Sequence, residues 1–190
     1  MGHIERKERE RENIHQRLLQ AALDIAKAEG WQGVTIRKIA NAVEYTTSVV
    51  YGHFESKELL LQEIIDNGFT ALYGKFIKTY KKESDPHKQL MDLSLIFWNF
   101  GLKNKELYQL MLSSGTPSNK TLLEAAPMLN DIMQKISGKS EKEAHSLVLN
   151  WTCLREGTIT RLLYLMGKEN DEGQQLYTDF MERFIKSISQ

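Results

Sequence analysis

The sequence predicts an all-α protein of about nine helices. Three observations support this fold class. Apolar residues recur every three to four positions through almost all of the chain, which is the spacing of one helix face. Proline, which breaks helices, occurs only three times in 190 residues. Capping residues precede several of the apolar segments, as is typical of helix starts.

The first two helices are marked by their end signals. The first helix should end near Gly30, because glycine favours the position just after a helix C-terminus. Thr35 is suited to N-cap a short second helix, with Val34 and Ile39 placed to pack across that cap. The apolar faces of these two helices comprise Ile14, Leu18, Ala22 and Ile25, then Ile36, Ile39, Ala40 and Val43.

The later helices are predicted from the same signals. Asp85 and Pro86 combine a capping aspartate with proline at the first helical position, and Ser140 with Glu143 forms a capping box. Pro127 predicts a kink or a late start in its helix. The expected ranges are 56–81, 86–100, 104–113, 122–136, 140–167 and 172–188.

The segment from Val43 to Tyr51 has the composition of a strand, with many β-branched and aromatic residues. A lone strand would leave its backbone groups unpaired, so a helix is favoured. A short turn at 43–45 then leads to Thr46, which caps a helix that ends near Gly52. Val50 and Phe54 should face inward, and the outward side chains should be Thr47, Ser48 and Tyr51.

A helix-turn-helix unit places such a short second helix in the major groove of DNA, where small hydroxyl side chains reach base edges and phosphates. The same geometry also occurs as a tight corner in helical proteins that do not bind DNA. Net charge does not decide between the two, because the chain has 25 basic and 25 acidic residues. Both interpretations stay open on the motif alone.

The wider pattern from Leu19 to Ile64 resembles the DNA-binding domain of the TetR (tetracycline repressor) family, without an insertion. Glu44 stands where the family has a turn glycine, and Ser48 stands at the glycine of the recognition helix. A left-handed backbone at Glu44 would cost about 1 kcal/mol. The matching residues are Ala22, Gly30, Thr35, Ile36, Ile39, Ala40, Thr46, Tyr51, His53, Phe54, Ser56, Lys57 and Leu60.

The resemblance implies a DNA-binding domain at 1–57 that reads a palindromic operator in double-stranded DNA. It implies phosphate contacts from Thr35, Tyr51, His53 and Lys57. It implies base contacts from Thr46, Thr47 and Ser48, with Arg37 and Tyr45 nearby. Packing against Phe54 is the alternative for the aromatic rings at 51 and 53. The charged segment 5–12 either offers basic side chains to a DNA groove or forms a solvated helix face.

For residues 58–190 the resemblance implies a helical domain that binds a small-molecule effector and forms a dimer. The sequence supplies aromatic and methionine side chains that suit a hydrophobic or amphipathic ligand, and a place in the core is the alternative for each. Arg155 could pair with a ligand carboxylate or with a glutamate from another helix. The candidate ligand-binding residues are Phe97, Trp98, Tyr108, Met111, Met128, Trp151 and Arg155.

The last two helices are expected to form a homodimer, because one chain cannot cover both of their apolar faces. These faces comprise Leu162, Leu163, Tyr164, Leu165, Leu176, Tyr177, Phe180 and Phe184.

An enzyme is the main rival class, but the sequence offers little for one. The five histidines lie on separate elements, there is one cysteine, and no glycine-rich phosphate loop or nucleophile elbow occurs. We expect no cofactor and no metal. The most apolar run, 93–102, is too short to span a membrane, and the predicted location is cytoplasmic.

The expected function is a repressor, released from its operator by a small hydrophobic or amphipathic ligand. The ligand release is implied by the resemblance alone. A helical interaction module or an enzyme, in either case without DNA binding, is the alternative.

Overall fold

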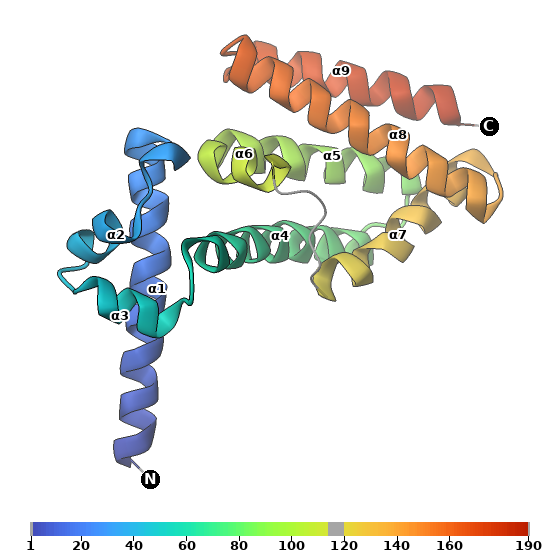
Figure 1. Ribbon diagram of the computed structural model, residues 1–190. Helices are drawn as coiled ribbons and strands as arrows, with labels where there is room; N and C mark the ends of the chain where they lie inside the picture. Colours follow the sequence, from blue (N-terminus) through green and yellow to red (C-terminus); the bar gives the residue numbers. More distant parts are fainter. Residues whose placement is uncertain (1, 114–119, 190) are drawn as a thin grey trace. The chain divides into compact units, whose positions relative to one another are not determined.

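The computed structural model describes residues 2–113 and 120–189 (Figure 1). These two ranges form nine α-helices, a 3₁₀ turn (Trp31–Gly33) and a π-helical segment (Thr160–Leu165), and they contain no strand. The all-α prediction is therefore confirmed. None of the helices in these ranges is long and apolar enough to cross a membrane. The helices are α1 (Gly2–Glu29), α2 (Ile36–Ala42), α3 (Thr47–His53), α4 (Lys57–Lys82), α5 (Pro86–Lys103), α6 (Lys105–Ser113), α7 (Lys120–Ser137), α8 (Glu141–Ile159) and α9 (Asp171–Ile188).

The described residues divide into two compact units. The first unit contains residues 2–67 and 106–113, and the second contains residues 68–105 and 120–189. The N-terminal part of α4 therefore belongs to the first unit and its C-terminal part to the second.

The first unit packs α1, α2, α3 and the start of α4 around one hydrophobic core. Leu107 and Leu110 of α6 pack against this core, and the indole N–H of Trp31 donates a hydrogen bond to the Glu106 carbonyl at 2.7 Å. The core holds the short α2 and α3 in place, since helices of this length are not stable alone. Each helix from α1 to α4 contributes at least one fully buried side chain to it, namely Leu18, Ala22, Ile39, Val50 and Leu60.

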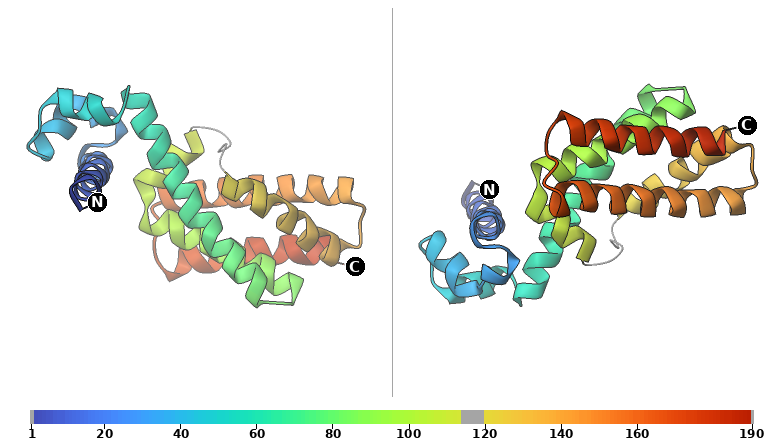
Figure 2. Two further views of the ribbon diagram at one scale, coloured as in Figure 1. Left: turned by 90° about the horizontal axis from the view of Figure 1, so that it is seen from below. Right: turned by 90° about the horizontal axis from the view of Figure 1, so that it is seen from above.

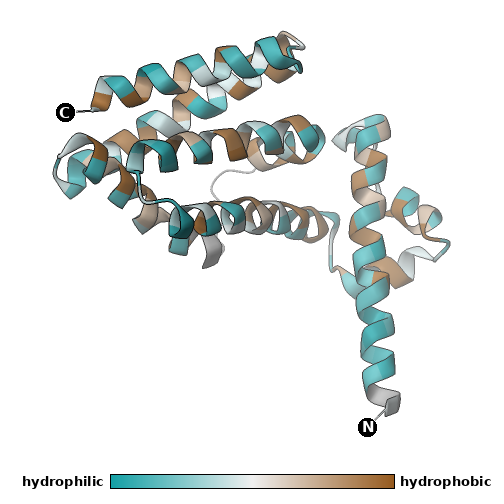
Figure 3. Cartoon of the chain, turned by 180° about the vertical axis from the view of Figure 1, so that it is seen from behind, coloured by the Kyte–Doolittle hydropathy of each residue, from teal (hydrophilic) through white to brown (hydrophobic). Residues whose placement is uncertain are grey.

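The first helix is longer than its apolar pattern predicts. α1 begins at Gly2, whereas the periodic apolar residues begin at Ile14. Beyond its grey end, the N-terminal half of α1 is mostly hydrophilic (Figure 3), and the side chains from 5 to 13 are all exposed. The charged segment 5–12 is therefore helical and faces solvent.

Most helix starts follow the predicted caps. The side chains of Thr35, Asp85 and Ser140 each accept a hydrogen bond from a backbone N–H in the first helical turn. Pro127 lies inside α7, which already includes Lys120. The alternative of a late start for this helix is therefore wrong.

In the second unit α5 contacts α7, α8 and α9. The fully buried Ser94 of α5 connects two of these helices. Its hydroxyl accepts a hydrogen bond from the Trp151 indole N–H at 3.0 Å, and its carbonyl accepts one from the Tyr177 hydroxyl at 2.8 Å. α8 and α9 lie side by side (Figure 2), so this serine fixes α5 against both members of the pair.

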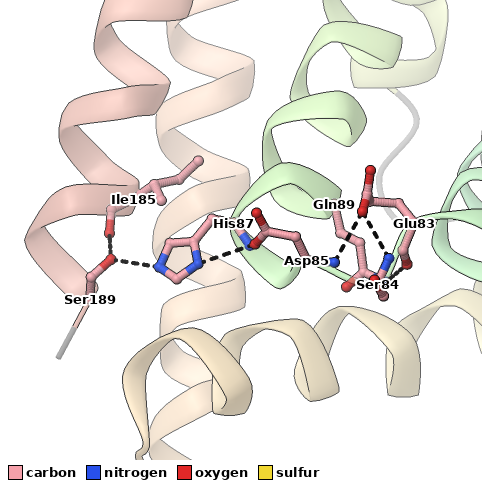
Figure 4. A network of polar contacts seen from close by, with 7 residues as sticks. All are labelled: Glu83, Ser84, Asp85, His87, Gln89, Ile185 and Ser189. Atoms are coloured by element: carbon pink, nitrogen blue, oxygen red, sulfur yellow. Dashed lines mark hydrogen bonds and ion pairs between the residues drawn. The ribbon is translucent and has the colours of Figure 1, made fainter.

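A second polar network ties the start of α5 to the end of α9 (Figure 4). The Lys88 ammonium and nearby backbone N–H groups, including that of Asp85, lower the pKa of Glu83 to about 2. One ring nitrogen of His87 lies 3.4 Å from the Asp85 carboxylate, and the other lies 3.1 Å from the Ser189 hydroxyl. Ser189, the last described residue, is thereby linked to the start of α5 within the second unit.

Candidate DNA-binding interface

The turn between α2 and α3 is a Schellman motif. The N–H of Tyr45 donates to the Ala40 carbonyl at 2.9 Å, and the N–H of Glu44 donates to the Asn41 carbonyl at 3.2 Å. Glu44 has φ 61°, and it is the only non-glycine residue with positive φ in the described ranges. The left-handed conformation considered for Glu44 is therefore present, at a position that glycine would occupy without strain.

This turn is held from outside by α1. The Arg17 guanidinium donates to the Val43 carbonyl at 3.3 Å and lies 5.7 Å from the centroid of the Tyr45 ring. Tyr45 is half-buried against the core of the first unit, so its ring covers the turn. No local pattern in the sequence pointed to Arg17, because its partners lie 26 residues or more along the chain.

α3 presents a surface of small hydroxyl groups. Val50 is fully buried and Phe54 is 4% exposed, whereas Tyr51 is 55% exposed, as predicted. Thr46 is the N-cap, but its side chain makes no capping hydrogen bond. Its hydroxyl group is thus not occupied by the cap. The exposed hydroxyl side chains on or beside α3 are Thr46, Thr47, Ser48 and Tyr51.

The flanking candidates lie at two other helix starts. Thr35 is exposed but uses its hydroxyl to accept from the Lys38 N–H at 3.2 Å. Arg37 is exposed on the first turn of α2. Lys57 is the half-buried first residue of α4, next to Ser56, whose hydroxyl accepts from the first turn of that helix. A helix start of this kind attracts phosphate.

His53 lies at the end of α3 and faces His15 of α1, with the ring centroids 5.7 Å apart. Burial lowers the pKa of His53, and the neighbouring His15 and Arg11 lower it further. His15 stacks on Phe54 at 4.5 Å and donates to the Glu63 carboxylate at 2.6 Å. The ring that stacks on Phe54 is therefore His15, which the sequence pattern had not singled out.

The candidate ligand-binding residues do not all lie in one unit. Tyr108 and Met111 are on α6 in the first unit, and both are buried. In the second unit Trp98 stacks on Tyr177 with centroids 5.1 Å apart, and Met128 is half-buried on α7. These observations fit core packing as well as a ligand site.

Phe97, Trp151 and Arg155 form one cluster in the second unit. The Arg155 guanidinium carbon lies 3.4 Å from the Phe97 ring centroid and 4.6 Å from that of Trp151. Arg155 pairs with Glu156, its neighbour on the same helix, at 2.7 Å. The expected pairing with a glutamate from another helix is therefore wrong, because the nearest carboxylate is on α8 itself.

The matched family and relatives fit this geometry. A family model described as "Bacterial regulatory proteins, tetR family" matches residues 18–64. The nucleoid occlusion factor SlmA of Enterobacter sp. (strain 638) is 24% identical over 152 residues, which cover 80% of this chain and 73% of SlmA. The HTH-type transcriptional repressor NicS of Pseudomonas putida is 24% identical over 104 residues, which cover 55% of this chain and 47% of NicS.

Solved structures show the same fold over nearly the whole chain. The crystal structure of a TetR variant from Acinetobacter baumannii AYE, in complex with minocycline, has a TM-score of 0.70 at 17% identity and covers 90% of this chain and 93% of that chain. A possible TetR family transcriptional regulator from Streptomyces coelicolor A3(2) has a TM-score of 0.71 at 13% identity, covering 91% of this chain and 97% of that chain.

The family match contains the whole helix-turn-helix unit together with the start of α4. Regulators of this family bind DNA and small-molecule ligands, and they dimerise. The family match at residues 18–64, the relatives and the shared fold together support a DNA-binding transcriptional regulator of the TetR family.

Proposed function

We propose that this regulator is a repressor that binds a palindromic operator as a homodimer and is released by a small hydrophobic or amphipathic ligand. In this proposal residues 1–57 read DNA, and residues 58–190 bind the ligand and form the dimer. The observation that carries it is the exposed hydroxyl surface of α3, which is held on a Schellman turn and backed by the buried Val50. Two relatives support it: NicS is named as a repressor, and the TetR variant is bound to minocycline.

The proposed DNA contacts follow from exposure and position. Thr46, Thr47 and Ser48 lie at the N-terminal end of α3, the end of a recognition helix that meets base edges. Hydroxyl groups there can donate to or accept from either kind of base edge. We assign the phosphate contacts to Thr35, Tyr51, His53 and Lys57, with Arg37 and Tyr45 flanking them.

The proposed dimer interface is the exposed face of α8 and α9. Leu149, Cys153 and Gly157 lie one turn apart on α8 and are all exposed. A Cβ added to Gly157 would meet nothing within 4 Å, so packing within the chain does not require glycine there. Glycine inside a helix costs about 0.5–1 kcal/mol, and a second copy approaching closely would account for it. Phe180 of α9 is 46% exposed and would join this face.

Only part of the predicted apolar set is available for such an interface. Leu162, Leu163 and Tyr177 are buried within their own chain. Leu165 is 67% exposed, and Phe184 is half-buried. The dimer face is thus smaller than the apolar pattern indicated, because the packing of α8 and α9 on α5 uses part of it.

Ligand release requires the effector to bind the DNA-competent and DNA-incompetent states with different affinities. We assign effector binding to aromatic, methionine and arginine side chains of the later helices that are buried or half-buried. The residues assigned all belong to the second unit and are Phe97, Trp98, Met128, Trp151 and Arg155.

Selection of bound sequences from random duplex DNA tests the proposal. We expect the selected sites to share two inverted half-sites, and gel shifts at stated salt should give a complex of one dimer per site. Thr47→Val and Ser48→Ala should relax the selected sequence, whereas Ser187→Ala, near the end of α9, should leave it unchanged. Recovery of unrelated sequences with no common half-site would reject the assigned function.

A further inference from the structure

Arg155 is a buried cation that lies against the faces of aromatic rings. Its exposure is 2%, and its guanidinium carbon lies 3.4 Å from the Phe97 centroid and 4.6 Å from the Trp151 centroid. Tyr73 extends this wall, with its ring edge-on to Phe97 at 6.0 Å. Burial raises the pKa of Tyr73, so its phenol stays neutral and supplies no counter-charge to the arginine.

The pairing of this cation is incomplete. One Nη of Arg155 contacts the Glu156 carboxylate at 2.7 Å, while its Nε, also buried, has no hydrogen-bond partner within the described residues. A guanidinium has five N–H donors and favours a carboxylate that accepts two of them. Leaving a buried donor of a charged group without an acceptor is unfavourable.

Glu156 is poorly placed to complete the pairing. Consecutive residues on an α-helix project about 100° apart, so adjacent side chains do not face each other. The Glu156 side chain is 39% exposed, whereas that of Arg155 is 3% exposed. The acidic partner therefore lies at the boundary between the buried guanidinium and solvent, where another carboxylate could exchange with it.

We propose that Arg155 anchors the carboxylate of the effector, which makes the effector a small organic acid with an apolar body. The acid displaces Glu156, binds the Nε and one Nη of Arg155 together, and lays its apolar part against Phe97 and Trp151. The regulatory consequence rests on the proposed function above, but the binding site can be tested without DNA.

Matched acid and amide pairs separate the charge from the apolar body. The probes are benzoate with benzamide and octanoate with octanamide, tested by thermal denaturation and by quenching of tryptophan fluorescence. A ligand that binds only the folded state raises the melting temperature. We expect at least one acid to raise it and to quench the fluorescence saturably, and its amide to bind about tenfold more weakly or worse.

Three variants assign the binding to the cluster. Arg155→Gln should weaken binding of the acid by about tenfold or more. Arg155→Lys should recover only part of this loss, because an ammonium lacks the planar pair of N–H groups with which arginine binds a carboxylate. Glu156→Gln should tighten binding, since it removes the competing carboxylate. Lys142→Gln, an exposed cation on the first turn of α8, should change nothing.

The possible results test the acid-binding site separately from the proposed release of DNA by the ligand. Equal binding of acids and amides, acid binding that survives Arg155→Gln, or no binding by any acid up to its solubility limit would overturn the assignment. If Arg155→Gln fails to fold by circular dichroism, an unchanged or weakened acid affinity in Glu156→Gln rejects it instead. If the acids bind through Arg155 but leave DNA affinity unchanged, the site stands and ligand release fails.

Discussion

The guanidinium of Arg17 donates to the carbonyl of Val43 at 3.3 Å, so that α1 holds the end of α2 at the point where the chain turns toward α3. The same guanidinium lies 5.7 Å from the centroid of the Tyr45 ring. α1 therefore contacts both the end of α2 and the first residue before the cap of α3, although neither α1 nor Arg17 belongs to the helix-turn-helix motif.

Removal of this contact should weaken DNA binding without a large loss of stability. Arg17 is exposed, so Arg17→Ala should lower the free energy of unfolding by about 1 kcal/mol, as for a typical hydrogen bond. Operator affinity should fall by more than this loss of stability explains, because α3 should be held less firmly in the orientation that binds DNA. Urea denaturation and gel shifts measure the two effects. Lys27→Ala, elsewhere on α1, is the control, and equal operator affinity in both variants would count against this role for Arg17.

Glu44 offers a stabilising substitution. Glu44→Gly should raise the free energy of unfolding by about 1 kcal/mol, because glycine adopts the observed φ of 61° without steric strain. Glu44→Gln removes the charge but keeps the strain, so it should not stabilise the protein. Both variants should bind DNA more tightly, since they remove a carboxylate that the proposed docking places near the phosphates. A glycine variant no more stable than the glutamine variant would contradict the strain argument.

Lys57 should contribute to DNA affinity independently of sequence. Lys57→Ala should remove one of the proposed phosphate contacts and reduce the slope of log affinity against log salt by about one. The loss should be the same for operator and random DNA. Lys75→Ala, an exposed lysine in the second unit, serves as the matched control. An unaltered salt slope for Lys57→Ala would exclude the assigned docking.

Phe180 tests the dimer interface. Phe180→Glu places a charge on the exposed face of α9 and should convert the proposed dimer to monomers, because an unpaired charge buried in an interface is strongly unfavourable. Light scattering measures the mass directly. Gln174→Glu adds the same charge at another exposed position on α9 and should remain dimeric. Dimers in both variants would move the interface to another surface.

His53 should make stability depend on pH. Its pKa in the folded protein lies below the ordinary value of 6.5, so the folded state binds fewer protons at this site than the unfolded state. The contribution of neutral His53 to the free energy of unfolding is complete above pH 6.5, and it is lost as the pH falls through the lowered pKa. Urea denaturation at a series of pH values should show a shallower loss for His53→Gln. His145→Gln, at an exposed position, is the control and should show the same pH dependence as the unsubstituted protein. The same pH dependence in His53→Gln would contradict the role assigned to His53.

The helix-turn-helix unit was predictable because its signals are local. Thr35 and Thr46 precede their helices directly, and the apolar spacing around Val50 and Phe54 identifies the buried side of α3. The helical conformation of residues 5–13 was not predictable, since their side chains are all exposed and a solvated helix segment has no apolar period.

Contacts between distant residues could not be read from the sequence. The His15 and Glu63 side chains meet across 48 residues, and no pattern links them. Leu162 and Leu163 have the composition of an interface, but the packing of the second unit decides that they are buried within one chain. The partner of Arg155 was missed because neighbours along a helix ordinarily point apart.

The seven residues of α3 divide between two tasks that do not constrain each other. Val50, with Phe54 just beyond the helix, is buried in the core, and Thr47, Ser48 and Tyr51 are exposed on its outer side. Mutations can therefore accumulate on the outer side without unfolding the domain. A lineage that carries this fold can acquire a new target sequence through a few substitutions while its architecture is inherited unchanged.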